Sequence, residues 1–169
     1  MSAQTLYDDL KAAQTTGLLL ELNGGKENLL KLIKLLYAIE RESIKRWSRP
    51  FTYDTLVSMP HGQVVSHTYD HIKTGVWGDC FKTIQKDGGK TVHLLRECGV
   101  GKLSRADISL IAEIYQIIKD KSPDDLEREH HDPECCQSAI WDTFKPYAWG
   151  LIKQCWQAPS DLGCSSCGG

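Results

Sequence analysis

The chain contains no long hydrophobic run and no surplus of basic residues. None of its apolar runs approaches the roughly 20 residues that a transmembrane helix requires. The start, Met1 to Gln4, lacks the basic segment and apolar run of a secretory signal peptide. Lysine and arginine number 20 against 22 acidic residues, so the formal net charge is −2 and gives no general attraction to a phosphate backbone. We therefore expect a cytoplasmic protein whose partner is neither a membrane nor a nucleic acid.

Recognisable catalytic motifs are also missing. The sequence has no Ser-His-Asp nucleophile elbow, no phosphate-binding loop and no dinucleotide fingerprint. His67 and His71 are four residues apart, as in metalloprotease helices, but Thr68 stands where the glutamate of that motif would be. These absences predict a protein that is not an enzyme. An enzyme of unrecognised type, built on the histidine-rich segments, is the alternative.

The composition is that of a globular domain. Hydrophobic residues make up 41% and charged residues 25% of the 169 residues, which is enough for one core and one domain. We expect a helical domain over residues 1–157 and a flexible Gly/Ser/Cys-rich tail over residues 158–169. Seven cysteines cannot all pair within one chain, so free thiols or a metal site are expected rather than a disulfide framework.

Hydrophobic periodicity predicts a mainly α fold, a compact helical domain with one small β-hairpin. Residues 81–84 and 91–95 flank Asp87-Gly88-Gly89 and predict the hairpin. Helices are predicted over residues 2–14, ended by Thr15-Thr16-Gly17, and over residues 26–47, 64–73, 104–118 and 137–156, with a short one after Ser122.

Capping signals refine two of these helices. Ser66 is expected to cap the helix of residues 64–73, Gly75 to end it, and Ser104 to form a capping box with Asp107. The apolar stripe from Leu29 to Tyr37 is expected to pack against residues 108–118. The opposite face of the same helix is interpreted as solvated; its residues are Lys31, Lys34, Glu40, Arg41, Glu42 and Lys45.

Three segments of the first half, Leu32 to Glu42, Arg49-Pro50 and Met59 to Val65, follow one another in a recognisable order. Together they resemble the Panacea domain of SocA-like antitoxins. In that family a Lys-Leu-Leu-Tyr helix is followed by a Gly-Arg-Pro turn and a Gly-Pro-Val signature. Ser48 and Gln63 stand where the family has the glycine of the turn and the proline of the signature. The matching positions are Lys34, Leu35, Leu36, Tyr37, Ala38, Arg41, Arg49, Pro50, Gly62 and Val64.

The second half is similar to the same family. There a long helix leads to a Ser-x-x-x-Leu turn, here Ser122 and Leu126, and then to a histidine-containing segment, here His131-Asp132-Pro133. The resemblance runs from about Ala12 to Trp141. It implies a helical domain with a small sheet element that neutralises a cognate toxin protein, or delivers the toxin to a protease or its unfoldase. A homodimer is left open.

Five residues are predicted to anchor the partner, because aromatic residues and arginine dominate interface hot spots. They are Arg41, Trp47, Arg49, Tyr53 and Trp77. The plainer interpretation of the arginines is a solvated helix face. Gly62, between a proline and a helix start, is expected to need a positive φ or a close approach.

A structural zinc site is the basis of the alternative function, a zinc-binding regulatory or DNA-associated module. Cys164 and Cys167 have the two-residue spacing of a zinc-binding pair, and Cys135 and His131 are the candidates for the remaining ligands. The favoured expectation is no cofactor, with the cysteines as an exposed thiol pair.

Overall fold

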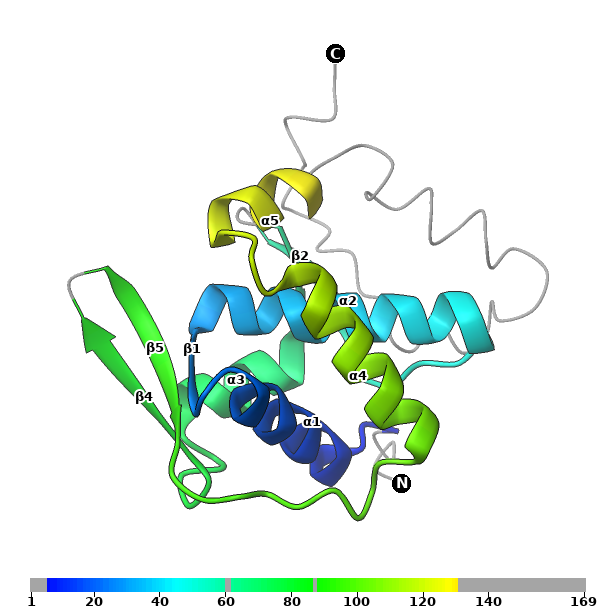
Figure 1. The fold of residues 1–169 in the computed structure, drawn as a ribbon, viewed down its shortest axis with the longest axis horizontal. Coiled ribbons are helices and arrows are strands. Elements are labelled where there is room, and N and C mark those ends of the chain that lie inside the picture. The colour runs from blue at the N-terminus through cyan, green and yellow to red at the C-terminus, as the bar shows by residue number, and fades with distance from the viewer. Residues whose placement is uncertain (1–5, 60–61, 87, 131–169) are drawn as a thin grey trace, which may run out of the picture.

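The computed structural model describes residues 6–59, 62–86 and 88–130. Five helices and five short strands follow one another in these residues (Figure 1). The helices are α1 (Asp9–Leu22), α2 (Leu29–Trp47), α3 (Ser66–Thr74), α4 (Arg105–Ile118) and α5 (Pro123–His130). The strands are β1 (Lys26–Asn28), β2 (Leu56–Met59), β3 (Gly62–Val65), β4 (Phe81–Lys86) and β5 (Gly89–Leu94).

Helix α2 is the central element of the fold. It crosses the middle of the molecule, with α1 and α4 on its near side and α5 above it in Figure 1. Its apolar stripe is buried, with Leu32 fully buried and Ile33 1% exposed, and packs against α4, where Ile111 is also fully buried. The predicted packing of the stripe from Leu29 to Tyr37 against residues 108–118 is therefore confirmed.

The strands form two antiparallel sheets rather than the single predicted hairpin. The predicted hairpin is present as β4 and β5, and β1 adds a third strand on the other side of β5. A second hairpin pairs β2 with β3. Residues 26–28, predicted as the first turn of a helix, are strand β1 because Asn28 caps α2 with its side chain and turns the chain.

The first helix is displaced from its predicted range. It continues through Thr15 and Thr16, whose hydroxyls donate to the carbonyls of Lys11 and Ala12 one turn earlier. Gly17 is not a break: a Cβ added there would lie 3.0 Å from Cys98, so glycine permits a close approach. Leu6, before the helix, and Leu10, in its first turn, are each 51% exposed.

Two predicted caps are confirmed and one is wrong. Ser104 forms the capping box with Asp107, and Gly75 ends α3 with a φ of 74°. Ser66 is the first residue of α3 and does not cap it. The cap position is occupied by Val65, whose side chain makes no capping hydrogen bond. Gly62 has a φ of 100°, as expected, at the start of β3.

The predicted helix of residues 137–156 and the predicted tail lie outside the described residues. Among the residues that the structure describes, no helix combines the length and the apolar character needed to span a membrane.

Candidate partner-binding surface

A buried carboxylate in α2 holds the loop that follows the helix, residues 48–55. Glu40 is 2% exposed and was predicted to be on the solvated face. Its carboxylate accepts hydrogen bonds from the backbone N–H groups of Phe51 (2.5 Å), Thr52 (3.0 Å) and Asp54 (3.2 Å), and from the Thr52 hydroxyl (2.9 Å). Burial raises the pKa of Glu40 to about 7, against the lowering effect of these hydrogen bonds.

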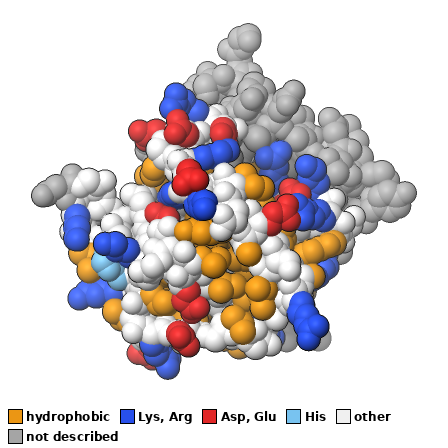
Figure 2. Space-filling model, viewed as in Figure 1, with side chains coloured by type: hydrophobic (Ala, Val, Ile, Leu, Met, Phe, Trp, Pro, Cys, Tyr) orange, Lys and Arg blue, Asp and Glu red, His pale blue; other side chains and the backbone are white. Residues whose placement is uncertain are grey.

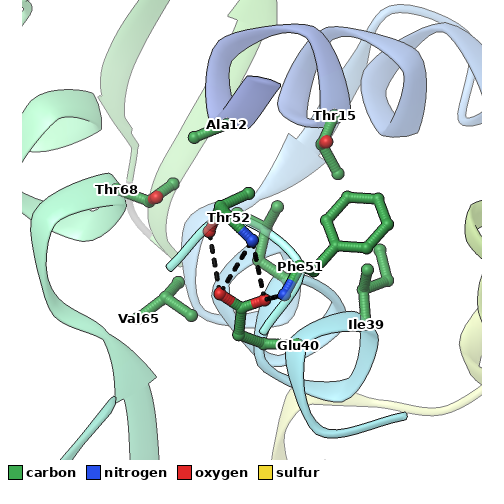
Figure 3. Close-up of a pocket in the computed structure, with 9 residues that line it drawn as sticks. Ala12, Thr15, Ile39, Glu40, Phe51, Thr52, Val65 and Thr68 are labelled. Atoms are coloured by element: carbon green, nitrogen blue, oxygen red, sulfur yellow. Dashed lines mark hydrogen bonds between the residues drawn. The ribbon is translucent and has the colours of Figure 1, made fainter. Parts of the chain in front are cut away.

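The environment of Glu40 is closed rather than open to a ligand. Figure 3 shows its carboxylate pointing toward the backbone of Phe51 and Thr52, with Thr15 of α1 and Thr68 of α3 on the far side of the loop. The cavity among these side chains measures about 10 Å³, which is about the volume that one water requires. It is too small for a substrate, so the arrangement fixes a loop and does not enclose a reaction centre.

A second buried carboxylate joins the same loop to α3. Asp54 is fully buried and accepts hydrogen bonds from the backbone N–H groups of His67 (2.8 Å) and Thr68 (2.9 Å). Asp54 therefore provides the helix capping that was predicted for Ser66, because it accepts hydrogen bonds from the free N–H groups at the start of α3. The His67 ring, with Nδ1 3.0 Å from the same carboxylate, is held in place by it.

A buried ion pair supports the loop from the other side. Lys11 of α1 places its Nζ 3.1 Å from Asp107 of α4 and 4.1 Å from the centre of the Phe51 ring. Burial acts to raise the pKa of Asp107, but hydrogen bonds from Ser104 and Lys11 outweigh it and hold that pKa below its usual value. Residues from α1, α2, α3 and α4 thus converge on one loop.

Three of the five predicted anchors lie on this loop or directly before it. The Arg49 guanidinium lies 5.3 Å from the centre of the Trp47 ring, and its side chain is 47% exposed. Trp47, the last residue of α2, is half-buried, and so is Tyr53, whose φ is 58°. An arginine stacked on an aromatic ring and fixed to a rigid backbone is typical of a protein-recognition site.

The other two anchors lie elsewhere. Trp77 follows α3, donates to Asp9 with its Nε1 (3.3 Å) and packs edge-on against His71 and Phe81. Arg41 is half-buried on the C-terminal half of α2. Arg46 pairs at the surface with Glu42 and with Glu113 of α4. The solvated-face prediction is wrong for Lys34 and Glu40, which are 4% and 2% exposed.

The family-motif residues are mostly structural. The buried Lys34 donates to the Gln63 carbonyl (3.1 Å), which positions the β2–β3 hairpin, and burial lowers its pKa to about 8. Tyr37 is fully buried, Pro50 is buried in the loop, and Val64 is half-buried in β3. Together they set the loop and the hairpin against α2.

The predicted metal ligands lie outside the described residues; they are His131, Cys135, Cys164 and Cys167. Within the part of the chain that the structure describes, no three potential ligands are grouped so that they could hold a metal ion.

Glu40, Asp54 and Lys11 were missed as functional determinants. For Glu40 a signal was present: Leu36 and Ile44 lie four residues before and after it, so it occupies the apolar stripe of α2. No comparable local pattern marks Asp54 or Lys11, because their partners are distant in the sequence.

Comparison with known proteins identifies the family. A model of the SocA-like antitoxin Panacea domain matches residues 32–136, well over half of the chain. No curated protein and no solved structure matches significantly. The matched segment contains most of α2, the 48–55 loop, both hairpins, α3 and α4. Trp47 at the end of α2 and Arg49 in the loop both lie inside it. The chain therefore belongs to the family of SocA-like antitoxins with a Panacea domain.

Proposed function

We propose that the protein is a non-catalytic, protein-binding antitoxin that neutralises a partner toxin through the surface formed by Trp47, Arg49 and Tyr53. The observation that carries the proposal is the exposed Arg49 over Trp47 on a loop held by the buried Glu40, inside the family match. A loop that is ordered before binding loses little entropy in the complex, so its side chains can contribute most of their contact energy to affinity.

The test is rescue of growth. Each open reading frame that flanks the gene is expressed from an inducible promoter in the bacterial host, with and without the protein. We expect one of these products to stop growth and the wild-type protein to restore it. The double variant Trp47→Ala/Arg49→Ala should lose rescue, because the removed side chains are the anchors of the interface.

A matched control distinguishes the surface from a general loss of charge. Arg128→Ala removes an arginine of α5 that is exposed and paired only with Asp125 in the described residues, and it should leave rescue intact. The toxin level, followed by immunoblot, separates two routes: a falling level indicates delivery to a protease, and a constant level indicates blocking. The proposal is contradicted if the wild-type protein restores growth against none of the flanking products.

A further inference from the structure

The outer face of the three-stranded sheet is cationic. The register places Lys26 of β1 opposite His93 of β5, and His93 opposite Lys82 of β4, so the three form one row across the sheet. Lys86 lies four residues after Lys82 in β4, and its side chain is therefore on the same face of the sheet. Figure 2 shows this concentration as lysine and arginine side chains around a histidine, on the side from which the β4–β5 hairpin projects in Figure 1.

No carboxylate compensates this charge within the described residues. The alternation of the strands puts the acidic residue of β1, Glu27, on the opposite, buried face. Lys26, Lys82 and Lys86 are exposed and make no ion pair with a described residue. The net charge of the chain is −2, so this face is a local reversal of the overall sign.

The same strand has a free edge. β4 is at one end of the sheet order β1-β5-β4. The bond from the Leu95 N–H to the Cys80 carbonyl (2.7 Å) fixes which residues of β4 face β5, and by alternation Lys82, Ile84 and Lys86 do. The backbone groups of Thr83 and Gln85 therefore point away from the sheet, and within the described residues they bond to no other backbone group.

An open groove runs beside this edge. It measures about 290 Å³ and lies between the end of α3 and the start of β4. Ile72, Phe81 and Leu95 form its apolar part, and Lys73 and Lys82 flank it. This volume accommodates a few side chains of a chain laid along the edge but is small for a drug-sized ligand.

We propose that the free edge of β4 binds an extended acidic segment of a partner protein, which adds to the sheet as a fourth strand. The Thr83 and Gln85 backbone groups supply the main-chain hydrogen bonds. Alternate side chains of the segment then lie beside Lys82 and Lys86 on the outer face and beside the apolar groove on the other. A segment in which acidic and apolar residues alternate satisfies both surfaces.

This surface is separate from that of Trp47 and Arg49. Strand β1 adjoins the start of α2, whereas Trp47 is the last residue of α2. A helix of 19 residues spans about 28 Å, so the sheet and Trp47 lie at opposite ends of α2. The inference goes beyond the proposed function, because it does not require the partner to be a toxin. Loss of one surface can therefore be measured without loss of the other.

Two other occupants fit less well. Single-stranded nucleic acid is bound by basic grooves with aromatic side chains for base stacking. The outer face has no Phe, Tyr or Trp, and its one ring is the half-buried His93; its residues are Lys26, Asn28, Lys82, Ile84, Lys86, Thr91 and His93. A second copy paired edge to edge would bring the lysines of two β4 strands together, and like charges across strands repel.

The test uses the full chain and a fluorescein-labelled peptide of about eight alternating glutamate and valine residues. We expect binding by fluorescence anisotropy at peptide concentrations below about 1 mM. In hydrogen exchange, the Thr83 and Gln85 amides should exchange rapidly in the free protein and slowly with the peptide. A peptide alternating lysine and valine should not bind, because it has the same strand preference but the wrong charge.

Variants separate the two contributions. Lys82→Glu/Lys86→Glu should weaken binding of the acidic peptide at least about tenfold, and the exposed Lys119→Glu should not. Gln85→Pro should also abolish binding, since proline removes an outward N–H that the β4–β5 ladder does not use, and Gln85→Ala should retain it. Thermal melting by circular dichroism checks that each variant is folded.

Four results would overturn the proposal. The first is no binding of the glutamate–valine peptide, and the second is equal binding by the wild type and the charge-reversed variant. The third is slow exchange of the Thr83 and Gln85 amides in the free protein, which would mean that another part of the chain or a second copy already covers the edge. The fourth is that a labelled single-stranded oligonucleotide binds more tightly than the peptide, and that Lys82→Glu/Lys86→Glu no longer binds this oligonucleotide.

Discussion

The Glu40 carboxylate accepts hydrogen bonds from four groups of the 48–55 loop while remaining almost fully buried. Burial of an ionised group is unfavourable, and donors aimed at it offset part of that cost. The balance leaves its pKa at about 7, above the value of an exposed glutamate. The side chain that holds the 48–55 loop therefore changes its protonation near neutral pH.

The first prediction concerns the pH dependence of stability. The folded protein binds the Glu40 proton more tightly than the unfolded chain does, so the free energy of unfolding should decrease as the pH rises from about 4.5 through 7. We expect the wild type to lose about 1–3 kcal/mol between pH 5 and pH 8. Glu40→Gln should remove most of this decrease, as measured by urea unfolding at the two values.

The glutamine variant should also be less stable than the wild type at pH 5. At this pH the wild-type side chain is a neutral carboxyl whose two oxygens can both still accept. The amide has one acceptor oxygen, and its NH₂ group faces the N–H donors of the loop, which costs about 1–3 kcal/mol. The matched control is Glu42→Gln, on the same helix but paired on the surface with Arg46. It should change the free energy of unfolding at pH 5, and the loss of stability between pH 5 and pH 8, by no more than about 1 kcal/mol each. An unchanged pH profile in Glu40→Gln contradicts the assignment.

At the scale of the element, α2 ends in a backbone conformation that favours glycine. Ser48 has a φ of 53° and follows Trp47 as the left-handed residue that stops the helix. A residue with a Cβ is strained in this region, which explains why the family turn that this segment resembles carries glycine at the same point. Here the strain is retained directly beside Arg49.

The second prediction is that Ser48→Gly stabilises the protein. Relief of the left-handed strain exceeds the greater freedom that glycine gives the unfolded chain, so we expect a gain of about 0.5–1 kcal/mol. Differential scanning calorimetry should show a rise of a few degrees in Tm. Ser48→Ala keeps a Cβ and should show no gain; equal stabilisation by both variants would mean that the backbone strain is not the cause.

At the scale of the whole molecule, one buried ion pair ties three segments together. Lys11 contacts Asp107 and the ring of Phe51, and so links α1, α4 and the 48–55 loop. The Asp8 N–H donates to the Thr52 carbonyl (2.8 Å) and adds a second link from α1 to the loop. Rigidity of the partner surface is thus a property of the assembled helices, not of the loop alone.

The third prediction is that Lys11→Met destabilises the fold by about 2–4 kcal/mol at pH 7. It removes the close, buried cation from the Asp107 carboxylate and leaves only the more distant and half-exposed Arg49, 3.9 Å away. The lowered pKa of Asp107 contributes stability above its unfolded value of 3.8 that is lost as the pH falls through the folded value. The difference in the free energy of unfolding between the wild type and Lys11→Met should therefore be smaller in acid. Guanidinium unfolding at pH 7 and at about pH 3 measures it.

The control for this prediction is Lys102→Met. Lys102 pairs with Asp8 at 3.6 Å, but its side chain is 52% exposed, so the loss should stay below about 1 kcal/mol. Equal losses in the two variants would show that burial of the Lys11 pair adds nothing.

Several features were readable from local sequence because they depend on neighbours along the chain. The periodicity of residues 29–47, the Ser104–Asp107 capping box, the Gly75 helix end and the β4–β5 hairpin all involve contacts within a few residues. The family resemblance depends on the order of such local motifs and was likewise available from the sequence.

Tertiary structure alone decided the rest. Strand β1 exists because β5, more than sixty residues later, offers a partner edge, and Asp54 caps α3 because a loop folds back onto it. The charge of Glu40 predicts exposure, because charged residues are exposed on average. Its hydrogen-bond donors come from a loop more than ten residues away, and local sequence does not show that the loop folds back onto it. The sequence by itself determined most of the helices that the structure describes, the β4–β5 hairpin and the family. Packing decided which charged side chains are buried, and hence which loop is held by contacts from several helices.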